Sequence, residues 1–362
     1  MKKNLKILMS GGGSGGHVFP AIAIADAIKK IAPDTEFLFI GALGKIEMTA
    51  VPKAGYTIEG LTIAGLQRRI SLKNLLFPFK LLFSLIKAWF IVKRFKPNAA
   101  IGTGGYASGA ALKVAQWQGV PSFVQEQNAF PGITNKLLSK KVSIVFAAYP
   151  GLEKYFEASK IQITGNPLRG SISLEGVSRS EACAHFGMDE KKPIVFITGG
   201  SLGASAINKA IAAKLDQFQK QGVQLIWQCG KIYEDSYKNL NSAQVKVLSF
   251  IDRMDFAYTA ADVIISRAGG TISELAIIGK PTILLPSPNV AEDHQTKNVM
   301  ALVEKDAAIL IKDKDAIENL VPTCLDLLQD KELQGKISKN IKQFAKPNAA
   351  VEIAQSILST IQ

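Results

Sequence analysis

Cysteine and histidine are scarce in this chain of 362 residues. The three cysteines, Cys183, Cys229 and Cys324, lie far apart, with no CxxC pair and no histidine at a metal-ligand spacing. This pattern excludes a disulfide framework and a zinc-finger type of site, and we expect reduced, buried thiols. The apolar stretch near the N-terminus is too short for a signal peptide. We therefore expect a cytoplasmic protein.

Acidic side chains are absent between Gly60 and Gln125, although the whole chain contains 43 Lys and Arg and 30 Asp and Glu. Basic residues are frequent in this segment, namely Arg68, Arg69, Lys73, Lys80, Lys87, Lys93, Arg94, Lys96 and Lys113. The formal net charge of +13 favours an anionic partner such as nucleic acid, acidic lipid or a phosphorylated substrate. Charge alone does not choose among these three.

No apolar run within residues 68–96 approaches the roughly 20 residues that cross a bilayer, because basic residues interrupt it throughout. Apolar residues instead recur at three-and-four spacing, on one face of a helix broken or kinked near Pro78: Leu72, Leu75, Leu76, Phe79, Leu82, Phe83, Ile86, Trp89 and Phe90. A basic stripe follows beside this face at seven-residue intervals, formed by Lys73, Lys80, Lys87 and Arg94. The pattern predicts a helix lying in a membrane interface. The alternative is a core helix whose lysines face water.

Short apolar runs alternate with helix-length segments along the whole chain. The runs occupy residues 5–9, 36–40, 122–125, 143–147, 194–198, 224–227, 263–266 and 282–285. Strands that are apolar throughout and separated by helices are typical of parallel sheets covered on both faces. The fold class is therefore predicted to be α/β and doubly wound. The chain also exceeds what one hydrophobic core usually organises, which favours two domains.

A glycine-rich loop follows an apolar strand twice, at residues 11–16 and 199–203. Strand, glycine loop and helix form the opening unit of a nucleotide-binding sheet, so we expect two Rossmann-like domains. Gly and Pro at 164–167 interrupt both periodicities and place the boundary between domains 1–164 and 165–344. The final segment has helical spacing and could pack on either domain.

Two side chains beside these loops are candidates for chemistry. His17 lies at the end of the first loop, where a general base is as plausible as a capping or packing role. Glu274 lies on the first helical turn after strand 263–266, where a carboxylate can accept hydrogen bonds from two vicinal ribose hydroxyls. Its alternative role is to complement the helix dipole.

Seven motifs occur in the order found in one enzyme family. They are GGGSGGH at 11–17, GTGGYASG at 102–109, QEQN at 125–128, GNPLR at 165–169, GGSLGA at 199–204, SRAGGTISE at 266–274 and EDHQTKN at 292–298. The chain thereby resembles the MurG family, the UDP-N-acetylglucosamine:undecaprenyl-diphospho-muramoyl-pentapeptide N-acetylglucosaminyltransferases of peptidoglycan synthesis. One departure lies between Gly269 and Thr271, where the chain is one residue shorter than the family pattern.

This resemblance implies a GT-B fold, with two Rossmann-like domains facing across a cleft and the terminal helix, 345–362, returning to the N-terminal domain. The donor should lie mostly against the C-terminal domain. The implied site residues are Ser14, Gly15 and Gly16 near the donor phosphates or the acceptor diphosphate, Asn128 on the donor sugar, Arg169 and Ser201 on the diphosphate, Ile251 on uracil, Gly270, Thr271, Ile272 and Ser273 along the α-phosphate, Glu274 on ribose and Gln295 on the GlcNAc hydroxyls. No cofactor is implied.

The implied reaction is an inverting transfer of N-acetylglucosamine from UDP-GlcNAc to the 4-hydroxyl of N-acetylmuramic acid in lipid I, which yields lipid II and UDP. His17 is the base candidate, and Arg169 with the loop amides would take the leaving-group charge without a metal. The partners are UDP-GlcNAc, lipid I, anionic inner-membrane lipids through residues 68–96, and proteins of cell-wall synthesis and division. The enzyme would sit peripherally on the cytoplasmic face of the bacterial inner membrane.

Three alternatives remain at this point. The first is a related GT-B glycosyltransferase that acts on a different lipid acceptor. An NAD(P)-dependent oxidoreductase is disfavoured because neither loop joins a GxGxxG pattern to an acidic residue about 20 residues on. A nucleic-acid-binding protein is disfavoured because the basic segment is apolar rather than interleaved with exposed stacking aromatics.

Overall fold

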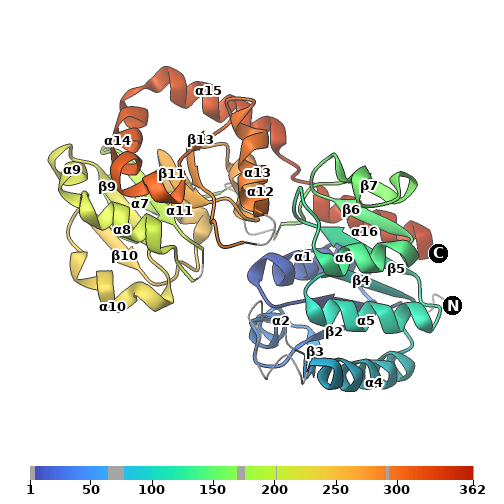
Figure 1. Cartoon of the computed structure of the whole chain (residues 1–362). Coiled ribbons are helices and arrows are strands. Elements are labelled where there is room, and N and C mark those ends of the chain that lie inside the picture. The colour runs from blue at the N-terminus through green and yellow to red at the C-terminus, as the bar shows by residue number, and fades with distance from the viewer. Residues whose placement is uncertain (1–4, 64–76, 169–175, 201, 291–292, 362) are drawn as a thin grey trace. The chain divides into compact units, whose positions relative to one another are not determined.

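The computed structural model describes residues 5–63, 77–168, 176–200, 202–290 and 293–361 (Figure 1). The chain divides into two compact units, one formed by Met1–Arg169 with Lys346–Gln362 and the other by Gly170–Ala345. The sequence prediction placed this boundary at 164–165 and the return of the chain at 345, whereas the two units divide after Arg169 and after Ala345. Each unit is built around its own parallel sheet.

The first unit contains a seven-stranded parallel sheet with strand order β3-β2-β1-β4-β5-β6-β7. The strands are β1 (Lys6–Gly11), β2 (Glu36–Ala42), β3 (Thr57–Leu61), β4 (Ala99–Gly104), β5 (Ser122–Glu126), β6 (Ile144–Ala147) and β7 (Ile161–Ile163). The helices are α1 (Gly15–Ile31), α2 (Glu47–Lys53), α4 (Phe77–Phe95), α5 (Tyr106–Trp117), α6 (Ile133–Leu138) and α16 (Ala349–Ile361). The order reverses at β1, so the loops after β1 and β4 diverge at a topological switch point.

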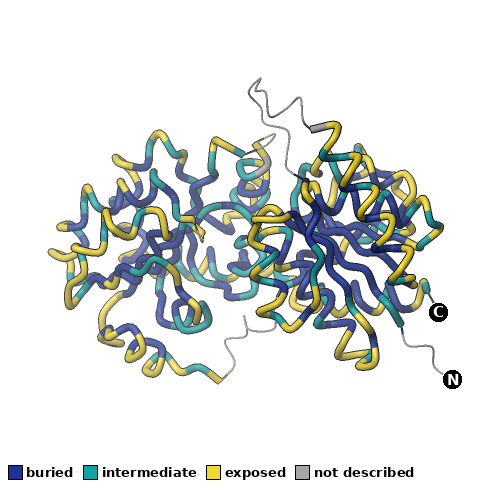
Figure 2. The backbone as a smooth tube through the Cα atoms, turned by 90° about the horizontal axis from the view of Figure 1, so that it is seen from below, coloured by how far each residue is buried: buried dark blue, intermediate teal, exposed yellow. Residues whose placement is uncertain are grey.

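Helices cover both faces of this sheet because alternate residues along its strands point to opposite sides. Leu8 belongs to the cluster that buries α4, α5 and α6, whereas Ile7 and Met9 belong to the cluster that buries α1 and α16. Figure 2 shows the strands as a buried interior under partly exposed helices. The core is therefore a three-layer α/β/α arrangement.

The terminal helix α16 packs on the first unit. Ile353 and Ile357 are buried in the cluster that also holds α1, and the Ser356 hydroxyl donates to Gln162 Oε1 at 2.8 Å. The spacing of its apolar residues predicted the helix but left its partner open. The structure supplies that partner, since the chain leaves the second unit at Ala345.

The second unit contains a six-stranded parallel sheet with strand order β10-β9-β8-β11-β12-β13. The strands are β8 (Ile194–Thr198), β9 (Gln224–Gln228), β10 (Val245–Leu248), β11 (Val263–Arg267), β12 (Thr282–Leu285) and β13 (Ile309–Leu310). The helices are α7 (Arg179–Phe186), α8 (Ser205–Ala213), α9 (Leu215–Lys220), α10 (Glu234–Tyr237), α11 (Met254–Ala260), α12 (Thr271–Ile278), α13 (His294–Val303), α14 (Ala316–Gln329) and α15 (Lys331–Ile341). Val195 and Ile197 face one cluster, and Ile194 and Phe196 face the other.

All eight apolar runs form strands in the structure, but five further strands were missed. Four of these, β3, β7, β10 and β13, lie at the edges of the two sheets. An edge strand is covered less completely, so it needs no continuous apolar run. The fifth, β4, is central, but small residues (AAIGTG) make up most of it. Its apolar signal is therefore weak.

Candidate functional site

The first glycine loop joins β1 to α1 in a turn held from two sides. Gly13 adopts a left-handed φ of 87°, and Ser14 is the extended N-cap residue of α1. The Gly12 N–H donates to Gly104 O at 3.2 Å, and the Gly13 N–H donates to Glu47 Oε2 at 2.9 Å. The loop is therefore fixed between the end of β4 and the start of α2.

Close packing explains why side chains are excluded here. A Cβ added to Gly11 would lie 1.9 Å from Thr103 Oγ1, and one added to Gly105 would lie 2.3 Å from Gly12 O. Contacts this short require glycine at both positions. The backbone around 11–13 and 103–105 thus forms one tightly packed element at the carboxyl end of the first sheet.

His17 is half-buried on the first turn of α1, and its ring is oriented by this loop. Its Nδ1 lies 3.0 Å from Gly12 O and 3.4 Å from Ser14 Oγ. A carbonyl oxygen only accepts, so we assign the proton of the neutral ring to Nδ1 and the lone pair to Nε2. A Cβ on Gly104 would lie 2.9 Å from Nε2, which shows how closely β4 approaches the ring. This orientation leaves Nε2 as the basic nitrogen.

Glu47 is a loop-supporting residue that sequence reasoning missed. Its side chain is fully buried and accepts backbone hydrogen bonds from Gly13 at 2.9 Å and from Ala42 at 3.0 Å. A buried carboxylate needs such donors. In the sequence it reads only as an acidic residue at the start of a helix, so no local signal marks it.

Asn128 is held by Glu126, two residues earlier in the QEQN motif. Its backbone N–H and its side-chain Nδ2 both donate to Glu126 Oε1, at 3.0 and 3.2 Å. The other oxygen of Glu126 accepts from Gly132 N at 3.1 Å and Asn135 Nδ2 at 2.9 Å. The buried carboxylate therefore shapes the whole loop after β5, a role that the sequence analysis did not assign.

The second glycine loop follows β8 at the carboxyl end of the second sheet. Gly200 and Gly203 both have left-handed φ values, 82° and 80°, and the Gly200 N–H donates to Thr198 Oγ1 at 3.2 Å. Two residues predicted for the diphosphate, Arg169 and Ser201, lie outside the described residues.

The loop after β11 leads directly into α12. Gly270 is the N-cap residue, Ile272 N–H donates to Gly269 O at 3.1 Å and Ser273 N–H to Gly270 O at 3.2 Å. The loop at 268–271, predicted to be one residue shorter than the family pattern, closes as a compact turn.

Arg267, at the end of β11, is tied into the scaffold of the second unit. Its guanidinium pairs with the Asp313 carboxylate and donates to Leu285 O at 3.1 Å. The pair joins the ends of β11 and β12 to the turn before α14.

Glu274 is half-buried on the first turn of α12, and Tyr258 of α11 holds it. The Tyr258 hydroxyl donates to Glu274 Oε2 at 2.7 Å. Burial raises the pKa of the Glu274 carboxyl above its ordinary value, and the hydrogen bond from Tyr258 opposes this rise. Burial, with the nearby carboxylate, also raises the pKa of Tyr258, so this hydroxyl stays a donor. Tyr258 was not a predicted site residue, since nothing local links it to Glu274.

Ile251 and Gln295 lie at the same carboxyl end. The Ile251 N–H donates to Gln228 Oε1 at 2.9 Å. Gln295 Oε1 accepts from Ser287 N at 2.7 Å, and its Nε2 lies 3.7 Å from where a Cβ on Gly269 would stand. The structure thus brings Gln295 to the loop after β11.

The predicted residues fall into two groups in separate units. Ser14, Gly15, Gly16 and His17 follow β1, and Asn128 follows β5 of the first sheet. Ile251, the stretch 270–274 and Gln295 follow β10, β11 and β12 of the second. Ligands of parallel α/β sheets bind at the carboxyl ends of strands, so each group has the position of a binding site.

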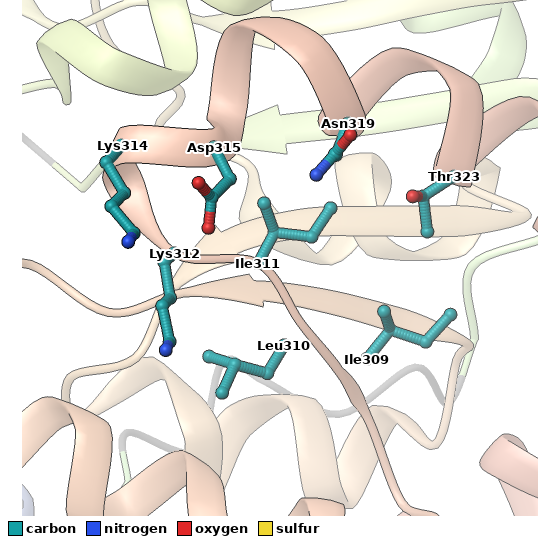
Figure 3. Close-up of a pocket in the computed structure, with 8 residues that line it drawn as sticks. All are labelled: Ile309, Leu310, Ile311, Lys312, Lys314, Asp315, Asn319 and Thr323. Atoms are coloured by element: carbon teal, nitrogen blue, oxygen red, sulfur yellow. The ribbon is translucent and has the colours of Figure 1, made fainter.

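A separate pocket of about 320 Å³ lies between β13 and the start of α14 (Figure 3). Its lining includes Ile309, Lys312, Lys314 and Asn319, and none of the predicted site residues. We assign it no part in the site. Within the part of the chain that the structure describes, no cluster of three or more His, Cys, Asp and Glu is placed to hold a metal ion.

Strand β2 and the loop before α1 bear on the dinucleotide-binding alternative. Gly11, Gly13 and Gly16 do have GxGxxG spacing, and Glu36 lies 20 residues beyond Gly16, contrary to the sequence prediction. Glu36 stands at the amino end of β2, where it pairs with Lys6 at 2.9 Å. The following strand β2, however, ends in Gly41 and Ala42, without the carboxylate that binds a dinucleotide ribose there. The acid nearest to this loop, Glu47, is buried on backbone amides instead.

Two Rossmann-like units, each with a glycine loop at the carboxyl end of its sheet, have the architecture of the GT-B class, and two family models identify the chain as a glycosyltransferase of this class. The model of the glycosyltransferase family 28 N-terminal domain matches residues 7–147, and that of the family 28 C-terminal domain matches residues 194–353. The chain belongs to the MurG family of N-acetylglucosaminyltransferases within this class, as its relatives show.

The chain is 53% identical, over 99% of its length and 98% of the relative, to the UDP-N-acetylglucosamine--N-acetylmuramyl-(pentapeptide) pyrophosphoryl-undecaprenol N-acetylglucosamine transferase of Flavobacterium psychrophilum. The protein of the same name from Porphyromonas gingivalis is 47% identical over 99% of this chain and 96% of its own. Among solved structures, Acinetobacter baumannii MurG has a TM-score of 0.75 at 27% identity, covering 98% of this chain and 99% of its own.

Proposed function

We propose that this chain transfers N-acetylglucosamine from UDP-GlcNAc to the 4-hydroxyl of N-acetylmuramic acid in lipid I, releasing UDP and forming lipid II. The relatives are named for this acceptor and this sugar, and the motifs of the family are present throughout the chain. The observation that carries the proposal is the Glu274 carboxylate, held by Tyr258 on the first turn of α12 at the carboxyl end of β11. Ligands of parallel sheets bind at this end of the strands, and the resemblance to the MurG family assigns this carboxylate to the donor ribose.

The donor is assigned to the second unit. Glu274 would accept the two ribose hydroxyls, and the start of α12 would face the α-phosphate with its dipole. The amides of Ile272 and Ser273 already bond within the turn, so Gly270 and Thr271 supply the amides for the phosphate. Arg169 and Ser201 would complete the diphosphate site.

Recognition of the base and the sugar follows from the same loops. The Ile251 N–H is bonded to Gln228, so this residue would read uracil through its carbonyl oxygen. Gln295 would present its amide to the GlcNAc hydroxyls from the start of α13. Asn128 would use its Oδ1 and the second hydrogen of its Nδ2 on the same sugar, because the bond to Glu126 takes only one Nδ2 hydrogen.

The first unit is assigned to the acceptor. The acceptor hydroxyl oxygen attacks C1 of GlcNAc from the side opposite UDP, and the new C1–O bond forms with inversion. The bond from C1 to the UDP oxygen breaks, and its electron pair leaves with the diphosphate. The hydroxyl proton passes to Nε2 of His17, which carries the lone pair in the tautomer of the neutral ring that donates from Nδ1 to Gly12 O. Ser14, Gly15 and Gly16 lie at the start of α1, where they would contact the diphosphate of the donor or that of the acceptor.

The activity itself can be tested with purified protein, labelled UDP-GlcNAc and a lipid I analogue. We expect label to move to the muramic acid residue with release of UDP. A second polyprenyl-diphosphate sugar that lacks the muramoyl peptide serves as the competing acceptor. Transfer to that acceptor but not to the lipid I analogue would favour the related glycosyltransferase instead.

Replacing Tyr258 by phenylalanine is expected to weaken UDP binding about three- to tenfold at neutral pH, no more than the size of one ordinary hydrogen bond, because Glu274 itself remains as the acceptor. The ionised Glu274 binds ribose, so affinity is present above its raised pKa and is lost as pH falls through it. Without the Tyr258 hydroxyl the pKa of Glu274 rises further. Calorimetric titrations of UDP at a series of pH values should show the loss of affinity beginning at higher pH in the variant. Identical pH profiles of the two proteins would show that the Tyr258 hydroxyl does not support Glu274 in binding ribose.

We further propose that α4 attaches the protein to anionic membranes. The apolar residues predicted for the membrane face lie outside the core wherever the structure describes them: Phe79, Leu82, Phe83, Ile86, Trp89 and Phe90 are all exposed. The opposite face packs into the core through Ala88, Ile91 and Val92. Leu72, Lys73, Leu75 and Leu76 lie outside the described residues. Pro78 sits in the first turn of α4, where its missing N–H breaks no helical bond.

The basic stripe of this helix is partly engaged within the unit. Lys87 Nζ donates to Gly60 O at 2.8 Å, and Arg94 pairs with Glu59, one residue before the acid-free segment begins. Because Lys87 and Arg94 are engaged within the unit, fewer basic side chains are available to contact lipid than the spacing predicted. The exposed aromatic residues therefore carry more of the proposed attachment. No helix in the described ranges is both long and apolar enough to cross a bilayer.

Changing Phe83 and Phe90 together to aspartate is expected to weaken binding to phosphatidylglycerol-containing vesicles at least tenfold, since each inserted phenyl ring contributes about 1.5–3 kcal/mol. Their side chains are 67% and 64% exposed, so the fold should tolerate the change. The matched control places aspartate at Ile232 and Ile317, exposed apolar residues of the second unit. Equal sedimentation of both double variants with vesicles would remove α4 as the attachment surface.

A further inference from the structure

Strand β9 carries a buried glutamine at each end, and the two differ in what they hold. Gln224, at the amino end, bonds only to the backbone of Asp189, through Nε2 at 2.7 Å and Oε1 at 2.8 Å. Gln228, at the carboxyl end, reaches two different loops. Both side chains are almost completely buried.

Every hydrogen-bonding group of the Gln228 amide has a partner. Nε2 donates to Thr198 Oγ1 and to Gly200 O, both at 3.1 Å, and Oε1 accepts from Ile251 N at 2.9 Å. The carbonyl of Gly200 only accepts and the amide of Ile251 only donates, so the orientation of the side-chain amide is determined. Gln228 therefore links the loop after β8 to the segment after β10.

The order of the sheet explains why this one side chain makes the link. Strand β9 lies between β10 and β8, so the loops after those strands are two strands apart and do not pair directly. The glycine loop also rests on the end of β9: a Cβ on Gly203 would lie 2.0 Å from Cys229 O, and one on Gly230 would lie 2.3 Å from Gly203 N. Gln228 stands at this junction and spans both neighbours.

We propose that Gln228 is a positioning residue for the donor nucleotide. It holds the glycine loop and the Ile251 segment at a constant separation, so a nucleoside diphosphate meets preformed sites for its phosphates and its base. This inference rests on the proposed function, in which both segments contact the donor. Preformed loops lose less conformational freedom on binding, and affinity is higher for that reason.

The test compares Gln228→Met with Gln224→Met. Both remove a buried amide from β9, so both should lower the denaturant midpoint. Only Gln228→Met should raise the Kd for UDP and the KM for UDP-GlcNAc, by about tenfold, because the two released segments must then be ordered on donor binding. Its KM for the lipid I analogue and its kcat should stay within about threefold of wild type, because loop positioning acts on donor binding.

Calorimetry and steady-state kinetics separate the outcomes. If wild type binds UDP and folded Gln228→Met binds it equally well, or if both variants lose affinity alike, the positioning role is wrong. If wild type itself fails to bind UDP, the proposed function is wrong instead.

Amide hydrogen exchange on wild type decides the matter if Gln228→Met does not fold. Bound UDP should then slow exchange at Gly203 and Ile251 by similar factors, because one side chain couples the two segments. Slowing at Gly203 alone would overturn the inference.

Discussion

Replacing His17 by alanine is expected to lower kcat about 10²- to 10⁴-fold while the KM values for both substrates change little, because a general base acts on the proton transfer and not on binding. The ring is oriented for this role by the bond between Nδ1 and Gly12 O, which places the lone pair of the neutral ring on Nε2. Single-turnover measurements with saturating UDP-GlcNAc and lipid I analogue would isolate this step.

His17→Asn is the matched control for the loop. The asparagine Nδ2 can take the place of Nδ1 and donate to Gly12 O, so the turn is preserved while the base is lost. We expect the same fall in kcat as for alanine, with a thermal midpoint closer to wild type. Near-normal turnover by His17→Ala at saturation of both substrates would show that the residue only supports the loop and that another group takes the proton.

Replacing Glu274 by alanine is expected to weaken UDP-GlcNAc binding by roughly 1.5–3 kcal/mol, or about 10- to 150-fold, because two ribose hydroxyls lose a charged acceptor. The Tyr258 hydroxyl, which donates to Glu274 at 2.7 Å, also loses its partner. The Tyr258 hydroxyl, left buried and unpaired in the variant, should lower the free energy of unfolding by about 1–3 kcal/mol. Glu274→Gln keeps an acceptor oxygen, so it should lose less donor affinity and less free energy of unfolding.

Calorimetry with UDP-GlcNAc well below the unfolding temperature separates these two effects. Glu318→Ala, an exposed acid on α14 of the same unit, controls for the change of charge. Unchanged donor affinity in Glu274→Ala would remove the ribose assignment, whatever happens to stability. A loss shared equally by Glu318→Ala would point to long-range charge instead.

Helix α4 shows what a periodic sequence pattern predicts about a helix and what it does not. Its spacing identified one apolar face, and Phe83 and Phe90 on that face are exposed in the structure. The same helix buries Ala88, Ile91 and Val92, so it is apolar on two sides. Periodicity ranks the faces of a helix by hydrophobicity but does not say which of two apolar faces the sheet will cover. Periodicity also did not predict the salt bridge from Arg94 to Glu59, because Glu59 lies in β3, a strand that was not predicted.

The sequence by itself determined the two parallel sheets, the glycine loops at their carboxyl ends and the family, because apolar runs and ordered motifs are local properties of the chain. Only the tertiary structure decided what holds these loops: Glu47 on Gly13, Tyr258 on Glu274 and Gln228 on Ile251. Each of these bonds joins residues that lie 34, 16 and 23 positions apart, respectively. Such polar partners are brought together by the packing of strands and helices, and burial then makes every unpaired group costly. A local sequence pattern therefore does not predict which of these polar groups pair.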